Sequence, residues 1–204
     1  FELQQTHCLT LRDTDARTRM EKLQKLKSVI QSHEVEIFSA LKRDLGKSEF
    51  EAALSEVYIV YSEIDFALKH LRHWMKPKKV SASLSGLLTK NRVYYEPKGV
   101  TLIIAPWNYP FQLLISPLVA AIAAGNCVVL KPSEVSSETS RLMTRLFADN
   151  FDEKEIACFE GDAQLATELL ALPFDHIFFT GGTEVGKVVM AAAAKNLTSV
   201  TLEL

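Results

Sequence analysis

Residues 100–130 read VTLIIAPWNYPFQLLISPLVAAIAAGNCVVL, and this stretch decides the fold. Val100–Ala105 is an apolar run rich in β-branched residues, which predicts a buried strand. Pro110–Ala124 is predicted to be helical, because a proline stands near its first turn and Gly125 lies just past its end. Cys127–Leu130 is a second short apolar run. A strand, a helix and a strand in this order predict one βαβ unit.

The alternation of strands and helices continues along the chain. Further strands are expected at Ile156–Phe159, His176–Phe179 and Val200–Leu202, and helices at Ser137–Phe147, Ala163–Leu170 and after the glycines through Ala194. Short apolar strands that alternate with helices indicate an α/β fold, with a parallel sheet covered by helices on both faces. Ligands of such sheets bind at the carboxyl ends of the strands.

Helical periodicity marks about residues 11–76, where apolar residues recur on one face at Met20, Leu23, Leu26 and Ile30. Ser32 is a candidate N-cap, Gly46 a candidate helix end, and Ser48 with Glu51 has capping-box spacing. Residues 78–98 change in character: Ser81, Ser83, Ser85 and Gly86 loosen the chain, and Arg92–Pro97 is predicted to be a short strand. We therefore expect three parts: N-terminal helices (1–77), a crossing or edge segment (78–98) and the strand–helix domain (99–204).

Composition narrows the class of protein. Of 204 residues 48% are hydrophobic, enough for a sizeable core, and a net charge of -2 argues against a nucleic-acid binder. The cysteines Cys8, Cys127 and Cys158 are few, odd in number and widely spaced, so no disulfide framework or zinc site is expected. With no visible N-terminal signal, these features favour a reducing, cytoplasmic location.

Polar side chains follow the first two strands of this domain. The amide of Asn108, in the loop APWNYP (105–110), could donate to a developing oxyanion. The alternative is that Asn108 caps the next helix, with Trp107 and Tyr109 as core anchors. Lys131 and Glu134 suit a polyol or phosphate ligand, because the lysine donates and the carboxylate accepts; an ordinary surface turn has the same residues.

Glycines follow the fourth strand, in Phe179–Gly186, where the chain runs into a helix. Backbone N–H groups at such a turn can approach a diphosphate, aided by the helix N-terminus. Residues 181–187 also match the start of a Walker A loop, so a nucleotide phosphohydrolase is an alternative. Val188 stands where Ser or Thr would hold magnesium, and Glu184 would repel the phosphates, which counts against it. Glu203, at the end of the last strand, is either a general base or an exposed terminal carboxylate.

Four motifs occur in order: APWNYP, AAGNCVVLKPSE, FFTGGTEVGK and VTLEL. Together they resemble the aldehyde dehydrogenase superfamily over essentially the whole chain. The stretch YEPKGVTLIIAPWNYP looks most like the class 3 branch, which includes fatty and aromatic aldehyde dehydrogenases. The resemblance implies a Rossmann-like parallel sheet with flanking helices, preceded by an N-terminal helical layer and a short strand segment for crossing or oligomerisation. It also implies NAD or NADP as cofactor, a small-molecule aldehyde as substrate and a homodimer.

The resemblance also implies residue roles. Asn108 would be the side-chain half of an oxyanion hole, and Glu203 the general base. Lys131 and Glu134 would hold the adenosine ribose of the cofactor. The remaining cofactor contacts would come from Ile104, Pro106, Trp107, Phe179, Gly181, Gly182, Thr183, Val185 and Gly186. The family often has Ser where this chain has Gly182, a change that keeps the backbone N–H donors.

In the family the motif at Glu203 continues as ELGGKSP, and the catalytic cysteine lies further on. The implied reaction oxidises an aldehyde to a carboxylic acid through a cysteine thiohemiacetal and thioester, and no cysteine of this chain matches that nucleophile. We therefore expect the chain alone to be inactive. A non-catalytic relative and a membrane anchor beyond residue 204 stay open.

Overall fold

The computed structural model describes residues 1–81 and 89–204 of the chain. Its helices are α1 (Glu2–Arg12), α2 (Ala16–Ser32), α3 (Glu34–Leu45), α4 (Glu49–Ala52), the π-helical turn η1 (Ala53–Val57), α5 (Tyr58–Trp74), α6 (Gln112–Ala124), α7 (Ser137–Asn150), α8 (Ala163–Leu170) and α9 (Thr183–Ala194). Its strands are β1 (Lys78–Val80), β2 (Asn91–Val93), β3 (Val100–Ile104), β4 (Cys127–Lys131), β5 (Ile156–Cys158), β6 (His176–Thr180) and β7 (Ser199–Glu203).

The central sheet is parallel and has the strand order β5-β4-β3-β6-β7. The predicted Rossmann-like α/β class is confirmed. From β3 the chain first builds outward through β4 and β5, and then returns to place β6 on the other side of β3. The order therefore reverses between β3 and β6, which is where open parallel sheets bind their ligands.

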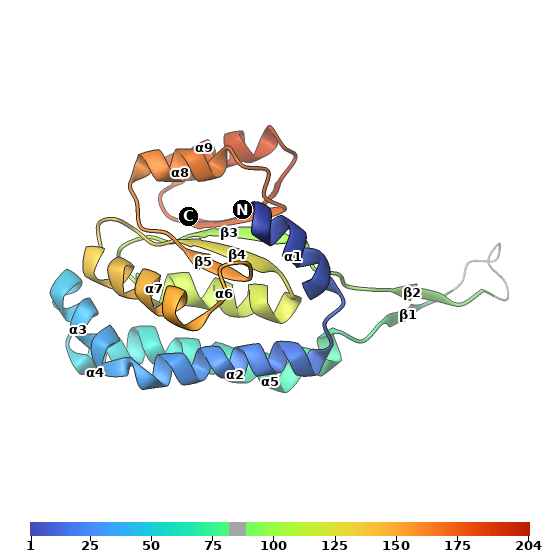
Figure 1. Cartoon of the computed structure of the whole chain (residues 1–204), viewed down its shortest axis with the longest axis horizontal. Coiled ribbons are helices and arrows are strands. Elements are labelled where there is room, and N and C mark those ends of the chain that lie inside the picture. The colour runs from blue at the N-terminus through green and yellow to red at the C-terminus, as the bar shows by residue number, and fades with distance from the viewer. Residues whose placement is uncertain (82–88) are drawn as a thin grey trace.

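Both faces of the sheet are buried at β3 and β4, as expected for the inner strands of a parallel sheet, whereas β6 is half-buried at alternate residues and β7 along most of its length. Ile103 of β3 points into the core shared with α2 to α7, whereas Leu102 and Ile104 point into the core shared with α1, α8 and α9. Figure 1 shows the resulting layers: α8 and α9 lie on one side of the sheet, α6 and α7 on the other, and α2 to α5 form a further layer beyond them.

The N-terminal helices follow the expected signals except at two places. Gly46 ends α3 with a positive φ of 69°, and the Ser48 side chain accepts a hydrogen bond from the N–H of Glu51, as predicted. Ser32 is not an N-cap: it is the last residue of α2, and its hydroxyl donates to the carbonyl of Ser28. Residues 2–10 were not predicted to be helical, but form most of α1. Pro77 lies after the end of α5 at Trp74, so the helix stops before the proline.

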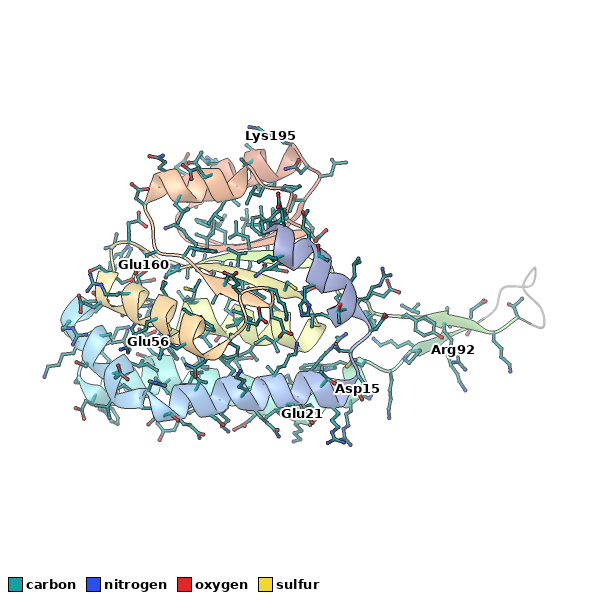
Figure 2. The ribbon with its side chains drawn as sticks, in the orientation of Figure 1. Asp15, Glu21, Glu56, Arg92, Glu160 and Lys195 are labelled. Carbon is teal, nitrogen blue, oxygen red and sulfur yellow. The ribbon has the colours of Figure 1, made fainter. Side chains whose placement is uncertain are left out.

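Residues 78–98 contain a hairpin instead of the single strand predicted over Arg92–Pro97. β1 pairs antiparallel with β2, and both strands are exposed along their length. Figure 1 shows this arm extending away from the body, and Figure 2 labels Arg92 on it. Ser83, Ser85 and Gly86, which were expected to loosen the chain, lie outside the described residues. Among the residues that are described, no helix is long and apolar enough to cross a membrane.

A carboxylate from the outer helical layer caps α7. Ser136, the residue before α7, makes no side-chain cap. Instead Asp44, near the end of α3, accepts hydrogen bonds from the backbone N–H groups of Glu138 at 3.0 Å and Thr139 at 2.7 Å. A negative charge at a helix N-terminus is favourable because it satisfies unpaired N–H groups and opposes the positive end of the helix dipole. The outer layer is therefore joined to the inner one by polar contacts as well as by apolar ones.

We predict that Asp44→Ala lowers the free energy of unfolding by about 1–2 kcal/mol, the usual effect of removing a helix cap. Chemical denaturation measures this. Asp65→Ala is the matched control: Asp65 also lies in a helix and pairs with Lys27, but its side chain is 58% exposed, so the loss should be roughly 0–1 kcal/mol. Equal losses in the two variants would contradict the capping role of Asp44.

Candidate functional site

A cavity of about 690 Å³ opens at the carboxyl ends of β3, β6 and β7, where the strand order reverses. It contains several of the predicted site residues, namely Pro106, Trp107, Asn108, Gly181, Gly182 and Glu203. The other lining residues are Glu63, Gln112, Leu113, Ser116, Pro117, Ala120, Phe178, Thr180 and Leu204. Segments that are about 95 residues apart in the sequence thus contribute to one cavity.

The loop between β3 and α6 presents Asn108 to this cavity. The Asn108 Oδ1 atom accepts a hydrogen bond from the N–H of Tyr109 at 3.1 Å, and its Nδ2 has no partner among the residues described. The alternative role for Asn108, a cap of the next helix, is wrong, since Glu56 caps α6. Trp107 and Tyr109 are 52% and 41% exposed, so they are not core anchors either. The amide is left with free donors facing solvent and cavity.

A buried ion pair lies beneath this loop. Glu56 is completely buried in the π-helical turn η1, and its Oε1 is 2.5 Å from the Nζ of Lys47. The Oε2 of Glu56 accepts from the N–H of Phe111 at 3.1 Å and of Gln112 at 2.8 Å, which caps α6. The Nζ of Lys47 also donates to the carbonyl of Asn108 at 3.0 Å. Figure 2 labels Glu56 at the junction between the outer and inner helical layers.

The desolvation of Glu56 has an electrostatic cost. Burial raises the pKa of the Glu56 carboxyl above its ordinary value, and the hydrogen bonds from Lys47, Gln112 and Phe111 oppose that rise. The ammonium group of Lys47 also lies 4.0 Å from the centre of the Tyr109 ring, a favourable position for a cation. These two side chains therefore make contacts with the backbone or ring of several residues in the loop.

The glycine turn after β6 leaves room beside the sheet. A Cβ on Gly181 would lie 2.5 Å from the Phe179 ring, so a side chain at this position would require the buried ring to move. A Cβ on Gly182 would meet no atom within 4 Å, which makes that backbone accessible. Thr183 begins α9, and Val185 and Gly186 lie in its first turns. Because α9 already begins at Thr183, most residues between Gly181 and Gly186 are helical and cannot form the loop with which a Walker A motif surrounds a phosphate.

Lys131 and Glu134 lie at the end of β4, at the same edge of the sheet but outside the lining of the cavity. The Nζ of Lys131 is buried and lies 2.9 Å from the Glu134 carboxylate. Partial burial raises the pKa of Glu134, but the hydrogen bond and charge of Lys131 outweigh it and hold this pKa below its ordinary value. The residue is therefore ionised at neutral pH. Ile104 of β3 lies in register with Phe179 of β6 on one side and with Lys131 of β4 on the other, and all three residues are buried.

Glu203 ends β7 opposite Thr180 of β6, and its side chain is exposed where it lines the cavity. The carbonyl of Glu203 accepts a hydrogen bond from the N–H of Gly181 at 3.0 Å. This bond ties the strand that carries the carboxylate to the start of the glycine turn. Asn108 and Glu203 therefore line one cavity from opposite sides of the strand-order reversal.

The cysteines of the chain take no part in this cavity. Cys127 and Cys158 are buried in β4 and β5, and burial raises the pKa of each thiol to about 12. Cys8 lies in α1, on the far side of the sheet core from α6. A thiol that stays protonated at neutral pH is a poor nucleophile. Within the described ranges there is also no cluster of three or more His, Cys, Asp or Glu residues that could hold a metal ion.

Sequence reasoning missed Lys47, Glu56 and Thr180. Glu56 stands at a buried position between Ala52 and Val60, so a charged residue interrupts an apolar helix face. That interruption was a usable signal for a buried polar role. The hydroxyl of Thr180 is buried with no hydrogen-bond partner in the described parts of the chain. Its place just before the two glycines was the only hint in the sequence.

The family model described as "Aldehyde dehydrogenase family" matches residues 4–204. A putative aldehyde dehydrogenase, AldX, of Bacillus subtilis is 48% identical over all of this chain and 46% of its own length. Aldehyde dehydrogenase family 3 member B3 of the mouse is 49% identical over 93% of this chain and 40% of its own. The chain thus spans less than half the length of these relatives.

Among solved structures, the substrate-bound state of Staphylococcus aureus AldH superposes with a TM-score of 0.97 at 43% sequence identity. The match covers all of this chain and 44% of the AldH chain. The order of the motifs and the parallel sheet are both consistent with the family match, which covers residues 4–204. The chain belongs to the aldehyde dehydrogenase family.

Proposed function

We propose that the protein to which this chain belongs oxidises an aldehyde to a carboxylic acid with NAD(P), and that residues 99–204 form its cofactor domain. The observation that carries this proposal is that Asn108, Glu203 and the turn at Gly181 and Gly182 line one cavity. An amide donor, a carboxylate base and exposed backbone N–H groups are what such a reaction needs in one place. The chain alone, without the cysteine that the family places further on, is proposed to be inactive.

The residues at the sheet edge fit a dinucleotide. Gly182 leaves open space at the N-terminus of α9, a helix end whose free N–H groups favour a diphosphate. Lys131 and Glu134 would hold the adenosine ribose. Ile104, Pro106 and Trp107 would lie on the nicotinamide side, and Phe179, Thr183, Val185 and Gly186 along the rest of the cofactor. When bound, the cofactor accepts a hydride from the substrate.

Two groups of this chain would act on the substrate. The Asn108 Nδ2 would donate to the carbonyl oxygen as a cysteine thiolate attacks the carbonyl carbon and negative charge develops on that oxygen. The thiohemiacetal formed in this way becomes a thioester once its carbon has lost a hydride to the bound cofactor. Glu203 would then take a proton from water as the water oxygen attacks the thioester carbon, whose bond to sulfur breaks to release the carboxylic acid and the thiolate. Glu203 is exposed at the cavity, so water can reach it.

Two further features belong to the same proposal. The exposed arm of β1 and β2 carries Val80, Val93, Tyr94 and Tyr95 with much of their surface in solvent, which suits pairing with a second copy of the protein. Residues 1–77 would stabilise the cofactor domain by packing against its helices α6 and α7. A reducing, cytoplasmic location, expected from the few and widely spaced cysteines, is part of the same proposal. The phosphohydrolase alternative is disfavoured because α9 begins at Thr183, which leaves no loop between Gly181 and Gly186. A non-catalytic role is disfavoured because Asn108 and Glu203 line the same cavity.

We predict a preference for NAD over NADP, because the ionised Glu134 carboxylate would repel a 2′-phosphate on the ribose that it holds. Titration of the intact protein with each cofactor measures the two dissociation constants. Glu134→Gln removes the charge and should bring the dissociation constant for NADP closer to that for NAD. Glu153 is an exposed carboxylate away from this edge of the sheet, so Glu153→Gln should leave both constants unchanged. A preference for NADP in the unmodified protein would contradict this role of Glu134.

We predict that Glu203→Gln in the intact enzyme slows thioester hydrolysis by roughly 10²–10⁴-fold, the usual contribution of a general base, and leaves hydride transfer largely intact. Rapid mixing should then show a burst of NADH followed by slow turnover. Glu168→Gln, an exposed carboxylate on α8, is the control and should turn over normally. Loss of the burst itself would mean that Glu203 acts at an earlier step or only supports the structure.

A further inference from the structure

Lys47 and Glu56 hold the loop that carries Asn108 at three backbone positions. Lys47 binds the carbonyl of Asn108 itself, and Glu56 binds the N–H groups of Phe111 and Gln112, where the loop becomes α6. The two side chains are joined at 2.5 Å. The Asn108 backbone therefore cannot shift relative to the start of α6 without breaking one of these contacts.

The direction of the Asn108 side chain follows from the same contacts. Its Oδ1 accepts from the N–H of Tyr109, and the Tyr109 ring lies against the ammonium group of Lys47. With the carbonyl of Asn108 and the ring of Tyr109 both on Lys47, the peptide between them is held. The direction of the Asn108 Nδ2 donor therefore depends on the position of this peptide and on the hydrogen bond of Oδ1.

Stability alone does not explain why this pair is charged. Two buried charges lose their hydration, and replacing such a pair with apolar residues is often neutral or stabilising. A buried ion pair keeps a defined geometry, however, because each charge needs its partners in place. Glu56 also lies in a π-helical turn, a feature that occurs frequently at functional sites.

We propose that Lys47 and Glu56 are positioning residues that hold the amide of Asn108 where the oxyanion of the reaction develops. This inference rests on the proposed function, because it needs Asn108 to be the oxyanion donor. Neither residue lines the cavity, so both act through the loop and not on the substrate. A donor misplaced by about 1 Å can lower a rate about 10²-fold, so a support of this kind has a measurable effect.

The test is a double-mutant cycle in the intact enzyme, with Lys47→Met, Asn108→Ala and both together. Asn108→Ala should lower kcat on the order of 10²–10³-fold. Lys47→Met should lower kcat by up to about 10²-fold. It should leave the KM for NAD nearly unchanged, because Lys47 contacts Glu56, Asn108 and Tyr109 and not Lys131, Glu134 or the glycine turn, which are proposed to hold the ribose and the diphosphate. In the Asn108→Ala background Lys47→Met should have little further effect on kcat, since there is no amide left to position.

A matched control separates positioning from general loss of stability. Lys22→Met removes a lysine that pairs with Glu155 at 2.6 Å and is partly buried, with 27% of its side chain exposed, but it lies outside the lining of the cavity. It should lower the melting temperature without changing kcat. If Lys47→Met does not fold, since it leaves Glu56 charged and unpaired, the cycle is run with Lys47→Met/Glu56→Gln, which removes both charges and keeps an acceptor for the N–H groups of α6.

The outcomes are distinct. If Asn108→Ala retains full activity, the proposed oxyanion role fails, and the positioning role fails with it. If Asn108→Ala is impaired but the loss caused by Lys47→Met is the same in both backgrounds, the proposed function stands and the positioning inference is overturned. The inference is equally overturned if a folded Lys47→Met enzyme keeps its kcat, or if Lys22→Met lowers kcat as much.

Discussion

The reversal of strand order between β3 and β6 is the constraint on which the site depends. The chain leaves β3 toward α6 on one face of the sheet, and leaves β6 toward α9 on the other. Because the two connections diverge, neither covers the edge between them, and a cavity forms at the carboxyl ends of the strands. Parallel pairing brings every carboxyl end to this edge, so Asn108, Gly182 and Glu203 line one cavity from distant parts of the sequence, and Lys131 lies at the same edge outside its lining.

The sheet sets where the loop after β3 begins, but it does not hold the loop's far end. That support comes from the outer helical layer, through Glu56 at the start of α6 and Lys47 at the carbonyl of Asn108. Asp44 makes the corresponding contact at the start of α7. In each case a carboxylate from the outer layer satisfies N–H groups at a helix N-terminus. The N-terminal helices thus do more than bury the apolar face of α6, because they define where the inner helices begin.

Much of this fold was predictable because its signals are local. The apolar runs of β3 and β4 are buried on both faces, and Gly125 and Gly46 end their helices with positive φ, as their positions indicated. The polar contacts were not predictable in the same way, since Asp44 lies 95 residues from Thr139, and Glu56 lies 55 from Phe111. Contacts between residues so far apart cannot be predicted from local spacing or from secondary-structure propensity. α1 was not predicted. Its Leu11 belongs to the core on the α8 and α9 side of the sheet, and its Gln4 donates to the carbonyls of Val128 and Glu153. The roles of the site residues came from the family resemblance, not from their types.

The central claim is that the carboxyl ends of β3, β4 and β6 form one dinucleotide site. Hydrogen–deuterium exchange of the intact protein, with and without saturating NAD, tests it most directly, because it locates binding along the backbone without requiring turnover. The account predicts slower exchange in the loop after β3, in the segment around Glu134 and in the first turn of α9, with no change in the outer helices α2 and α3. Unchanged exchange in these three segments at saturating NAD, or protection confined to another part of the chain, would contradict it.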